Sequence, residues 1–346
     1  MTSLLNITLC GGGNLTHAQA AYLARKGHRV RIYTRRPDLW RLHLTASFYD
    51  GDTREVRLAA VSAFPEIVSD SDIVIVSLPR YAIGEVTEQI YPYLGENTLL
   101  VYAPGMPALL DMEKELRWQN RNLCALYKVP FISRTEKYGH SVSVLGSREV
   151  NRIWYSREGM ECYTSLLQEL FDTPLVPLTS AYPFLLTNSN PLLHPSRLVA
   201  MFKNYEQGSY YPRNFFFYEE WTDESSELYI RADEELLKIC EKCPGMLIGK
   251  DIIPVKEYYE SPTVGALTKK INSITAFKGI LSPMKQVSKG WVPDFDSRYF
   301  TEDIAWGTEP ICRYAKGVGI DTPTLDYFVN WTKNMIKIHC HPIAQP

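Results

Sequence analysis

A glycine turn near the N-terminus constrains the fold of this 346-residue chain more than any other feature. The apolar run 4–10 leads into the segment 11–16, which reads Gly-Gly-Gly-Asn-Leu-Thr, and an Ala-rich helical pattern follows over 17–26. A strand, a glycine turn and a helix in this order can hold a pyrophosphate, because the helix N-terminus offers free N–H groups and a positive dipole end. We expect Gly11 to permit the tight turn and Gly13 to let the backbone approach a phosphate.

The glycine pattern departs from the usual dinucleotide-binding form at its third position. Thr16 stands where that form has Gly or Ala, and Asn14 and Leu15 lie just before it in the predicted cofactor site. The alternative is a glycine turn that only joins a strand to a helix. The strands and helices that alternate behind it favour the binding interpretation.

The second predicted strand, 28–33, indicates which nucleotide is bound. It alternates polar and apolar residues, as a half-buried strand does. It ends at Thr34, Arg35 and Arg36, about 20 residues beyond the glycines, where the residue that contacts the ribose lies. An NAD enzyme usually carries Asp or Glu there, whereas a hydroxyl and two guanidinium groups fit a 2′-phosphate. The sequence therefore favours NADP (as NADPH), and NAD is the alternative if these arginines are only solvated loop charges.

Further strands are predicted at 56–58, 73–78, 99–102, 123–127 and 142–145. The continuously apolar ones among them are expected to be buried on both faces, as a parallel sheet requires. Pro79 and Pro104 follow two of these runs, at the carboxyl ends that line the cofactor crevice of a doubly wound sheet. A helix over 159–171 closes this part. We predict an α/β N-terminal Rossmann domain, with a doubly wound parallel sheet, over 1–178.

The second half of the chain has a different pattern. From about residue 178 the strands cease and helical periodicity dominates. The helical patterns cover 194–206, 223–240, 263–280, 301–317 and 323–337. We predict an all-α substrate and catalytic domain over 179–346. The sequence is compatible with a homodimer and does not fix the oligomeric state.

Charge and apolar content restrict the partners. The formal net charge is −2 and the pI is about 6.4, so the chain lacks the basic character of a nucleic-acid-binding protein. No apolar run approaches the roughly 18 residues of a membrane span, and 2–10 is too short for a signal peptide. We expect a cytoplasmic protein with small-molecule substrates and with no nucleic-acid or membrane partner.

The seven cysteines form no disulfide framework, which is typical of reduced thiols. Cys240 and Cys243 form a C-x-x-C pair, but the pair follows a helical run, 226–239, where no N-terminal dipole would stabilise a thiolate. A zinc site would need further ligands, for which the His-Cys-His run at 339–341 is the candidate. We expect no metal, and the role of the pair stays open.

His194 is the first candidate for proton transfer. It stands in the run 188–197, immediately before Pro195, and Pro suits the first turn of a helix. We therefore expect His194 at a helix start, with Asn190 and Arg197 beside it as substrate-binding residues. An imidazole can exchange a proton near neutral pH, although a histidine beside a proline also serves as a capping or packed residue.

A second candidate set lies in the run 295–307. Thr301 is a good N-cap residue, which would place Glu302 and Asp303 in the first turn of a helix, and for Glu302 we favour this capping role. Arg298 could bind a substrate carboxylate through its guanidinium group. Asp303 could orient the imidazole of His194 and stabilise its charged form.

These stretches occur together with others in an order that resembles one family. The matching runs are the glycine turn with Asn14, Val-Pro-Phe-Ile-Ser-Arg at 129–134, Tyr-Gly at 138–139, Val-Leu-Gly at 144–146, Asn-x-x-x-His-Pro at 190–195, Arg-Tyr-Phe-Thr-Glu-Asp-Ile at 298–304, Gly307 and Thr-Pro at 322–323. The chain resembles the octopine/nopaline (opine) dehydrogenase family over most of its length.

The resemblance implies a reaction and roles for three residues. His194 would be the catalytic proton donor, Asp303 its partner and Arg298 a carboxylate anchor. The substrate would be the imine formed by an amino acid, or a related amine, and a 2-oxo acid such as pyruvate or 2-oxoglutarate. Hydride would come from the nicotinamide cofactor, and the product would be an N-(carboxyalkyl) amino acid.

Two alternatives differ from this interpretation in testable ways. A ketopantoate reductase, or another 2-hydroxy-acid dehydrogenase, shares the N-terminal fold and the basic end of the second strand but needs no amine. A non-catalytic NADP-binding sensor would share only the dinucleotide site. Such a sensor would not need His194, Arg298 and Asp303.

Overall fold

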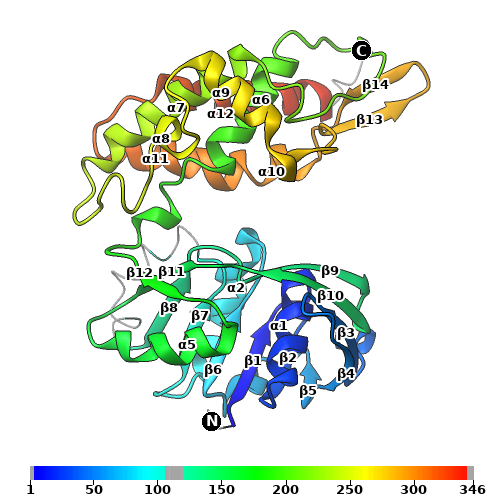
Figure 1. Cartoon of the computed structure of the whole chain (residues 1–346), viewed down its shortest axis with the longest axis vertical. Coiled ribbons are helices and arrows are strands. Elements are labelled where there is room, and N and C mark those ends of the chain that lie inside the picture. The colour runs from blue at the N-terminus through cyan, green and yellow to red at the C-terminus, as the bar shows by residue number, and fades with distance from the viewer. Residues whose placement is uncertain (1–3, 106–108, 110–117, 119, 341–346) are drawn as a thin grey trace, which may run out of the picture. The chain divides into compact units, whose positions relative to one another are not determined.

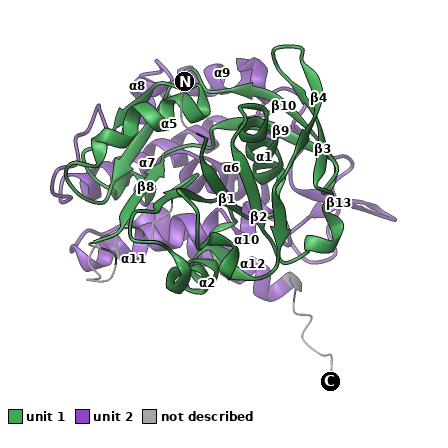
Figure 2. Cartoon of the chain, turned by 90° about the horizontal axis from the view of Figure 1, so that it is seen from below, with its two compact units in different colours: residues 1–184 green, residues 185–346 purple. Residues whose placement is uncertain are grey.

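The computed structural model describes residues 4–105, 109, 118 and 120–340 of the chain, which form two compact units, 1–184 and 185–346 (Figure 2). The sequence pattern puts the border slightly earlier, after residue 178.

A mixed sheet forms the centre of unit 1, with the strand order β12-β11-β8-β7-β6-β1-β2-β5 (Figure 1). Its strands are β1 (Asn6–Cys10), β2 (Arg29–Tyr33), β5 (Ala60–Ser62), β6 (Ile73–Val76), β7 (Leu99–Tyr102), β8 (Asn122–Leu126), β11 (Asn151–Tyr155) and β12 (Leu175–Pro177). Neighbouring strands run parallel except where β11 meets β8. The sheet confirms the predicted Rossmann fold and adds an antiparallel edge to it.

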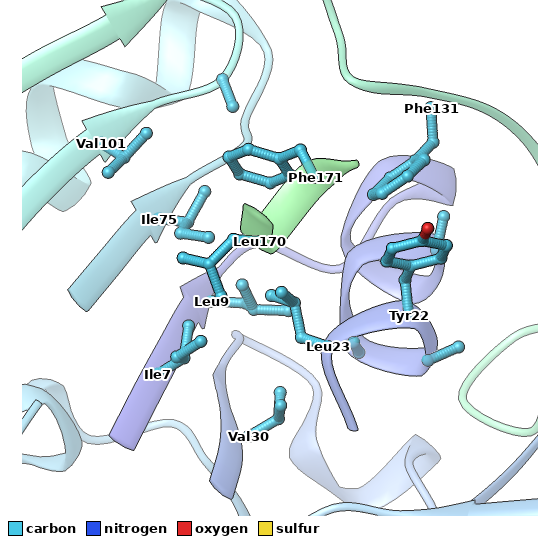
Figure 3. Close-up of a cluster of buried hydrophobic side chains, with 14 of the residues drawn as sticks. Ile7, Leu9, Tyr22, Leu23, Val30, Ile75, Val101, Phe131, Leu170 and Phe171 are labelled. Atoms are coloured by element: carbon cyan, nitrogen blue, oxygen red, sulfur yellow. The ribbon is translucent and has the colours of Figure 1, made fainter. Parts of the chain in front are cut away.

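Helices on both faces bury the central strands. Every residue of β6 and β7 is buried, as expected for a parallel sheet covered on both sides. Figure 3 shows Ile75 and Val101 in one cluster with Phe171 of α5 (Thr164–Phe171). Side chains alternate along a strand, so Tyr102 points to the other face, where its hydroxyl lies 3.0 Å from that of Thr87 in α2 (Arg80–Ile90).

A second sheet, in the order β4-β3-β10-β9, also belongs to unit 1. Its strands are β3 (His43–Phe48), β4 (Thr53–Arg57), β9 (Phe131–Lys137) and β10 (Ser141–Ser147). Strands are thus present at the predicted runs 56–58 and 142–145, but they belong to this second sheet and not to the main one. Both runs alternate in burial, because only one face of this second sheet is covered.

The helix α1 (Asn14–Arg25) lies between the two sheets and begins three residues before the predicted start. It is buried continuously from Thr16 to Leu23, which is unusual for a helix that covers only one sheet. Tyr22 points toward Phe131 of the second sheet, with ring centroids 4.5 Å apart, whereas Leu23 points into the main core (Figure 3).

Unit 2 consists mainly of helices, in agreement with the predicted helical domain, and also carries a hairpin of β13 (Met284–Val287) and β14 (Gly290–Pro293) that projects from them (Figure 1). The helices are α6 (Asn190–Phe202), α7 (Asp223–Cys240), α8 (Val255–Tyr258), α9 (Val264–Ser273), α10 (Arg298–Thr301), α11 (Glu309–Gly317) and α12 (Pro323–Cys340). A π-helical turn, η7 (Ile304–Thr308), joins the segment after α10 to α11. Across the described residues, we find no helix with the length and apolar character that a membrane crossing requires.

Candidate active site

Unit 1 contains a pocket of about 600 Å³ at the carboxyl ends of β1, β2 and β6. Seven of the predicted cofactor residues line it: Gly11, Gly13, Asn14, Thr34, Arg35, Arg36 and Pro79. Leu15 and Pro104 were also predicted but do not line this pocket. Tyr138 and Thr135, which come from the second sheet and its loop, line the pocket without having been assigned to the site from the sequence.

The glycine turn has a shape that only glycine permits. Gly11 has a φ of +146°, and a Cβ there would lie 2.6 Å from the carbonyl oxygen of Ser77. A Cβ on Gly12 would lie 2.4 Å from the Tyr138 hydroxyl. Nothing lies within 4 Å of a Cβ built on Gly13, which lines the open pocket. This cradle, followed by the N-terminus of α1, fits the pyrophosphate of a dinucleotide.

The Thr16 departure is accommodated inside the turn. Thr16 is fully buried, and its Oγ1 would lie 2.6 Å from a Cβ on Gly11, so the threonine fills space that Gly11 leaves free. Its hydroxyl makes no hydrogen bond within the described residues. Thr16 therefore packs against the turn rather than lining the pocket.

His17 fixes the glycine turn to the second sheet. The backbone N–H of Gly139 donates to His17 Nε2 at 2.8 Å, so Nδ1 carries the proton and donates to the Gly13 carbonyl at 2.9 Å. Burial lowers the pKa of His17, which favours this neutral form. Tyr138, next to Gly139, is thereby held over the pocket, with the Arg36 guanidinium 4.7 Å from its ring centroid.

The ribose end of the pocket is basic. Arg35 and Arg36 are exposed there, and no carboxylate of the described chain lies within ion-pair distance of either guanidinium group. Glu85 also lines the pocket, where its Oε1 accepts a hydrogen bond from Gln89 Nε2 at 3.2 Å. Two guanidinium groups without an ion-pair partner among the described residues suit an anion more than a ribose hydroxyl.

In unit 2, His194 lies in the second turn of α6 rather than at the predicted helix start. Pro191 occupies the first turn, and Pro195 lies inside the helix. Pro195 has no N–H to donate to the Pro191 carbonyl four residues earlier, and the Thr308 hydroxyl donates to that carbonyl instead, at 2.6 Å. A Cβ on Gly307 would lie 2.8 Å from Pro191, so a glycine at 307 permits this close approach.

The imidazole of His194 has a partner on each nitrogen. Nδ1 lies 2.7 Å from Asp303 Oδ2, and Nε2 lies 2.9 Å from the Tyr218 hydroxyl. The His194 side chain is only 8% exposed, and the Tyr299 ring packs on it with centroids 4.5 Å apart. Burial raises the pKa of Tyr218 far above its usual range, so its hydroxyl stays protonated. The predicted contact between His194 and Asp303 is present, and Tyr218 is a second partner of the imidazole that the sequence did not predict.

Asp303 reaches His194 from a turn that differs from the predicted one. The N-cap role predicted for Thr301 is wrong, because α10 begins after Ser297 and ends at Thr301. The Thr301 hydroxyl donates to the Ser297 carbonyl within that helix and therefore caps nothing. Asp303 precedes η7, where its carbonyl accepts from the Thr308 N–H at 3.1 Å. A π-helical turn of this kind directs the carboxylate toward α6.

The two arginines predicted to bind substrate differ in burial. Arg298 has a side chain that is 80% exposed and donates to Glu302 at 2.7 Å. Arg197 is 4% exposed, one turn beyond His194 on α6, and its Nε donates to the Phe217 carbonyl at 2.9 Å. Burial lowers the pKa of Arg197 to about 10, and within the described chain no carboxylate forms an ion pair with it. The first residue of α6, Asn190, is exposed.

The C-x-x-C pair, Cys240 and Cys243, lies at the C-terminal end of α7, and both thiols are buried. Burial raises the pKa of Cys240 and of Cys243, which disfavours the reactive thiolate. No group of three metal-ligating side chains occurs in the part of the chain that the structure describes. The side chains of the run 339–341 lie outside the described residues.

Two family models match the two units. The model described as "NAD/NADP octopine/nopaline dehydrogenase, alpha-helical domain" matches residues 177–336, and the model for "Ketopantoate reductase PanE/ApbA" matches residues 7–143. The chain is 25% identical to the octopine dehydrogenase of Pecten maximus, over 96% of this chain and 90% of that protein. It is 24% identical to the tauropine dehydrogenase of Arabella iricolor, over 95% and 91%.

Solved structures show the same fold. A structure of octopine dehydrogenase with NADH and pyruvate superimposes with a TM-score of 0.84 at 24% identity, covering 96% of this chain and 89% of that one. A ketopantoate reductase from Ralstonia eutropha JMP134 gives a TM-score of 0.64 at 13% identity, covering 97% and 100%.

The glycine-turn pocket together with the helical domain defines the class, an NAD(P)-dependent oxidoreductase of two domains. Within that class, the helical unit belongs to the octopine/nopaline dehydrogenase family, whose model matches residues 177–336, and the chain as a whole is similar to octopine and tauropine dehydrogenases.

Proposed function

We propose that the chain catalyses the NADPH-dependent reductive condensation of an amino acid, or a related amine, with a small 2-oxo acid such as pyruvate or 2-oxoglutarate. The observation that carries this proposal is the Asp303–His194 pair, buried in a helical domain of the octopine/nopaline type. The octopine dehydrogenase that this chain resembles has been solved with NADH and pyruvate and, separately, with L-arginine. Pyruvate and L-arginine each carry a carboxylate, and L-arginine also carries the amine.

The proton chemistry follows from the partners of His194. An ionised Asp303 carboxylate can only accept hydrogen bonds, so it holds the proton on Nδ1 and stabilises the charged imidazole. The second proton of the charged ring is then on Nε2, from which it can be donated to the imine nitrogen or to the oxo oxygen. When bound in the unit 1 pocket, the reduced nicotinamide supplies hydride to the former carbonyl carbon.

The basic ribose end of the pocket supports a preference for NADPH over NADH. Arg35 and Arg36 can each donate charge-assisted hydrogen bonds to a 2′-phosphate, and Thr34 adds a hydroxyl. A carboxylate at the end of β2 would repel that phosphate, and the chain has none at 34–36.

Arg298 is the proposed anchor for the oxo-acid carboxylate, and the buried Arg197 is proposed to bind substrate beside His194. Replacing Arg298 with alanine is expected to raise the KM of the oxo acid by roughly 10–100-fold with a smaller change in kcat, because charge-assisted hydrogen bonds contribute about 1.5–3 kcal/mol. Steady-state kinetics in which the oxo acid is varied at saturating amine and NADPH measure this effect. Arg231→Ala, which also removes an arginine paired with a glutamate four residues away, is the matched control.

Parallel measurements on Arg197→Gln separate the two anchors. If Arg298→Ala leaves the KM of the oxo acid unchanged while Arg197→Gln raises it, the anchor is Arg197. If neither changes it, both roles are wrong.

The alternatives from the sequence remain distinguishable by experiment. A ketopantoate-reductase-like enzyme would oxidise NADPH with an oxo acid alone, and a sensor would bind NADPH without turnover. The helical unit supports the imine-reducing function, because residues 177–336 match the octopine/nopaline helical domain. The test is whether NADPH oxidation by an oxo acid requires an added amine.

We also propose that the enzyme works in the cytoplasm on small molecules, with a homodimer as the oligomeric form to be tested. The scattered cysteines suit a reducing compartment, and a net charge of −2 does not favour nucleic acid. Light scattering of the purified chain would measure the oligomeric state.

A further inference from the structure

The nitrogen of His194 that would donate the proton already has a protein partner. Its Nε2 lies 2.9 Å from the Tyr218 hydroxyl, and both side chains belong to unit 2. Tyr218 is 6% exposed and is held in place by aromatic rings, with Phe277 stacked at 4.1 Å and Trp221 at 6.3 Å between centroids. The Trp221 indole in turn donates to the Ser226 hydroxyl at 2.9 Å. The phenol is therefore fixed by packing and does not rely on its hydrogen bond for position.

We propose that Tyr218 is a positioning residue for the transferable proton of His194, and that its hydroxyl stabilises the charged imidazole in the substrate-free enzyme. The inference rests on the proposed function only in the statement that His194 donates this proton during reduction. Asp303 fixes one proton on Nδ1, so the neutral and charged rings differ at Nε2. A phenol can donate to Nε2 in the neutral ring and accept from Nε2–H in the charged ring, without moving its oxygen.

Other groups around the imidazole do not replace this contact. The Tyr299 ring packs on His194, but its hydroxyl makes no hydrogen bond within the described residues. On α6 itself, Arg197 donates to backbone carbonyls of the segment 216–217. Tyr259 is the remaining titratable neighbour whose charge would affect Tyr218, besides Tyr299 and Asp303.

Charged groups on the other elements that pack on α6 have partners of their own. From α10, Arg298 donates to Glu302 at 2.7 Å. From α7, the two oxygens of Asp233 accept from Asn188 Nδ2 and from the Val255 N–H, each at 2.8 Å. From α12, Lys333 pairs with Glu309 at 2.9 Å. From η7, the Thr308 hydroxyl donates to Pro191. Among the described residues, the hydrogen-bond partner of His194 Nε2 is thus the Tyr218 hydroxyl.

Removing the hydroxyl should disfavour the charged ring more than the neutral one. The bond from a charged Nε2–H is charge-assisted and roughly twice as strong as a neutral bond. In Tyr218→Phe, the protonated imidazole should therefore persist only to a lower pH. Because reduction needs that proton, kcat/KM, which reports groups of the free enzyme, should decline with rising pH about 1 pH unit earlier than in the unaltered enzyme.

NMR of the full-length, substrate-free protein with ¹⁵N-labelled histidine tests the inference directly. The His194 signals are assigned by their loss in His194→Asn, and their titration is compared in Tyr218→Phe and Tyr299→Phe. Tyr299→Phe is the matched control, because it removes a phenol hydroxyl from the same cluster but none that bonds the imidazole. We expect the midpoint to move about 1 pH unit down in Tyr218→Phe alone.

A midpoint that does not move in Tyr218→Phe, or that moves equally in both variants, would overturn the inference. The titration needs no substrate, so its outcome is independent of the proposed reaction. A shifted midpoint in an enzyme that shows no amine-dependent turnover would contradict the proposed function while supporting the role of Tyr218.

Discussion

Replacing His194 with alanine is expected to lower turnover by roughly 10²–10⁴-fold, the usual size of a general-acid effect. The imidazole lies between the Asp303 carboxylate and the Tyr218 hydroxyl, and its loss removes the proton donor while leaving the carboxylate in place. NADPH binding should change little, because the glycine-turn pocket lies in unit 1 and His194 in unit 2. Single-turnover kinetics and a fluorescence titration with NADPH would measure the two quantities separately.

The controls for this prediction separate chemistry from folding. His194→Asn keeps an amide donor near Asp303, so it should fold even where the alanine variant leaves that carboxylate without its partner. His43→Ala removes another histidine–carboxylate pair, with Glu55 at 2.9 Å, from an exposed site in unit 1 and should leave turnover unchanged. Turnover in a folded His194→Asn variant that matches the unaltered enzyme would refute the general-acid role.

The double variant Arg35→Ser, Arg36→Ser is expected to raise the KM of NADPH by roughly 10²–10⁴-fold, because each guanidinium–phosphate contact contributes about 1.5–3 kcal/mol. The KM of NADH should change far less, since NADH lacks the 2′-phosphate. Both arginines are exposed at the pocket, so their removal should not affect folding. Initial rates with each coenzyme, at fixed amine and oxo acid, give the two values.

Arg41→Ser is the matched control for charge alone. Arg41 is also exposed and close in sequence, but it does not line the pocket, so both coenzymes should bind as before. Equal rises in the KM of NADPH and NADH in the double variant would show that the arginines do not contact a 2′-phosphate. An unaltered enzyme that favours NADH would contradict the NADPH preference itself.

Local patterns were sufficient to predict the glycine turn and five strands of the main sheet, β1, β2, β6, β7 and β8, but not the outer strands β5, β11 and β12. β6 (Ile73–Val76) and β7 (Leu99–Tyr102) consist of apolar residues, and a strand covered on both faces needs that composition. The second sheet could not be assigned in this way. The register of β10 against β3 pairs Val142 with Ala46, and no local pattern indicates which strand an alternating segment will join.

The resemblance and the chemistry of the residues predicted the His194–Asp303 pair. They did not predict the position of His194 within its helix or its contact with Tyr218. Pro195 was predicted in the first turn of a helix, and it lies inside one. The carbonyl of Pro191 that Pro195 leaves unbonded accepts from the Thr308 hydroxyl, 117 residues beyond Pro191. Tyr218 belongs to an aromatic segment, 205–221, that is conspicuous in the sequence. Its contact with Nε2 depends on how that segment packs on α6, which the sequence does not specify.

The amine dependence of NADPH oxidation tests the central claim most directly. The purified enzyme is mixed with NADPH and either pyruvate or 2-oxoglutarate, each with and without a pool of amino acids, and the loss of NADPH absorbance is followed. We predict oxidation when an oxo acid and an amine are both present, and division of the pool would then identify the amine. Oxidation at the same rate with an oxo acid alone would contradict the imine mechanism and assign the chain to the 2-hydroxy-acid dehydrogenases.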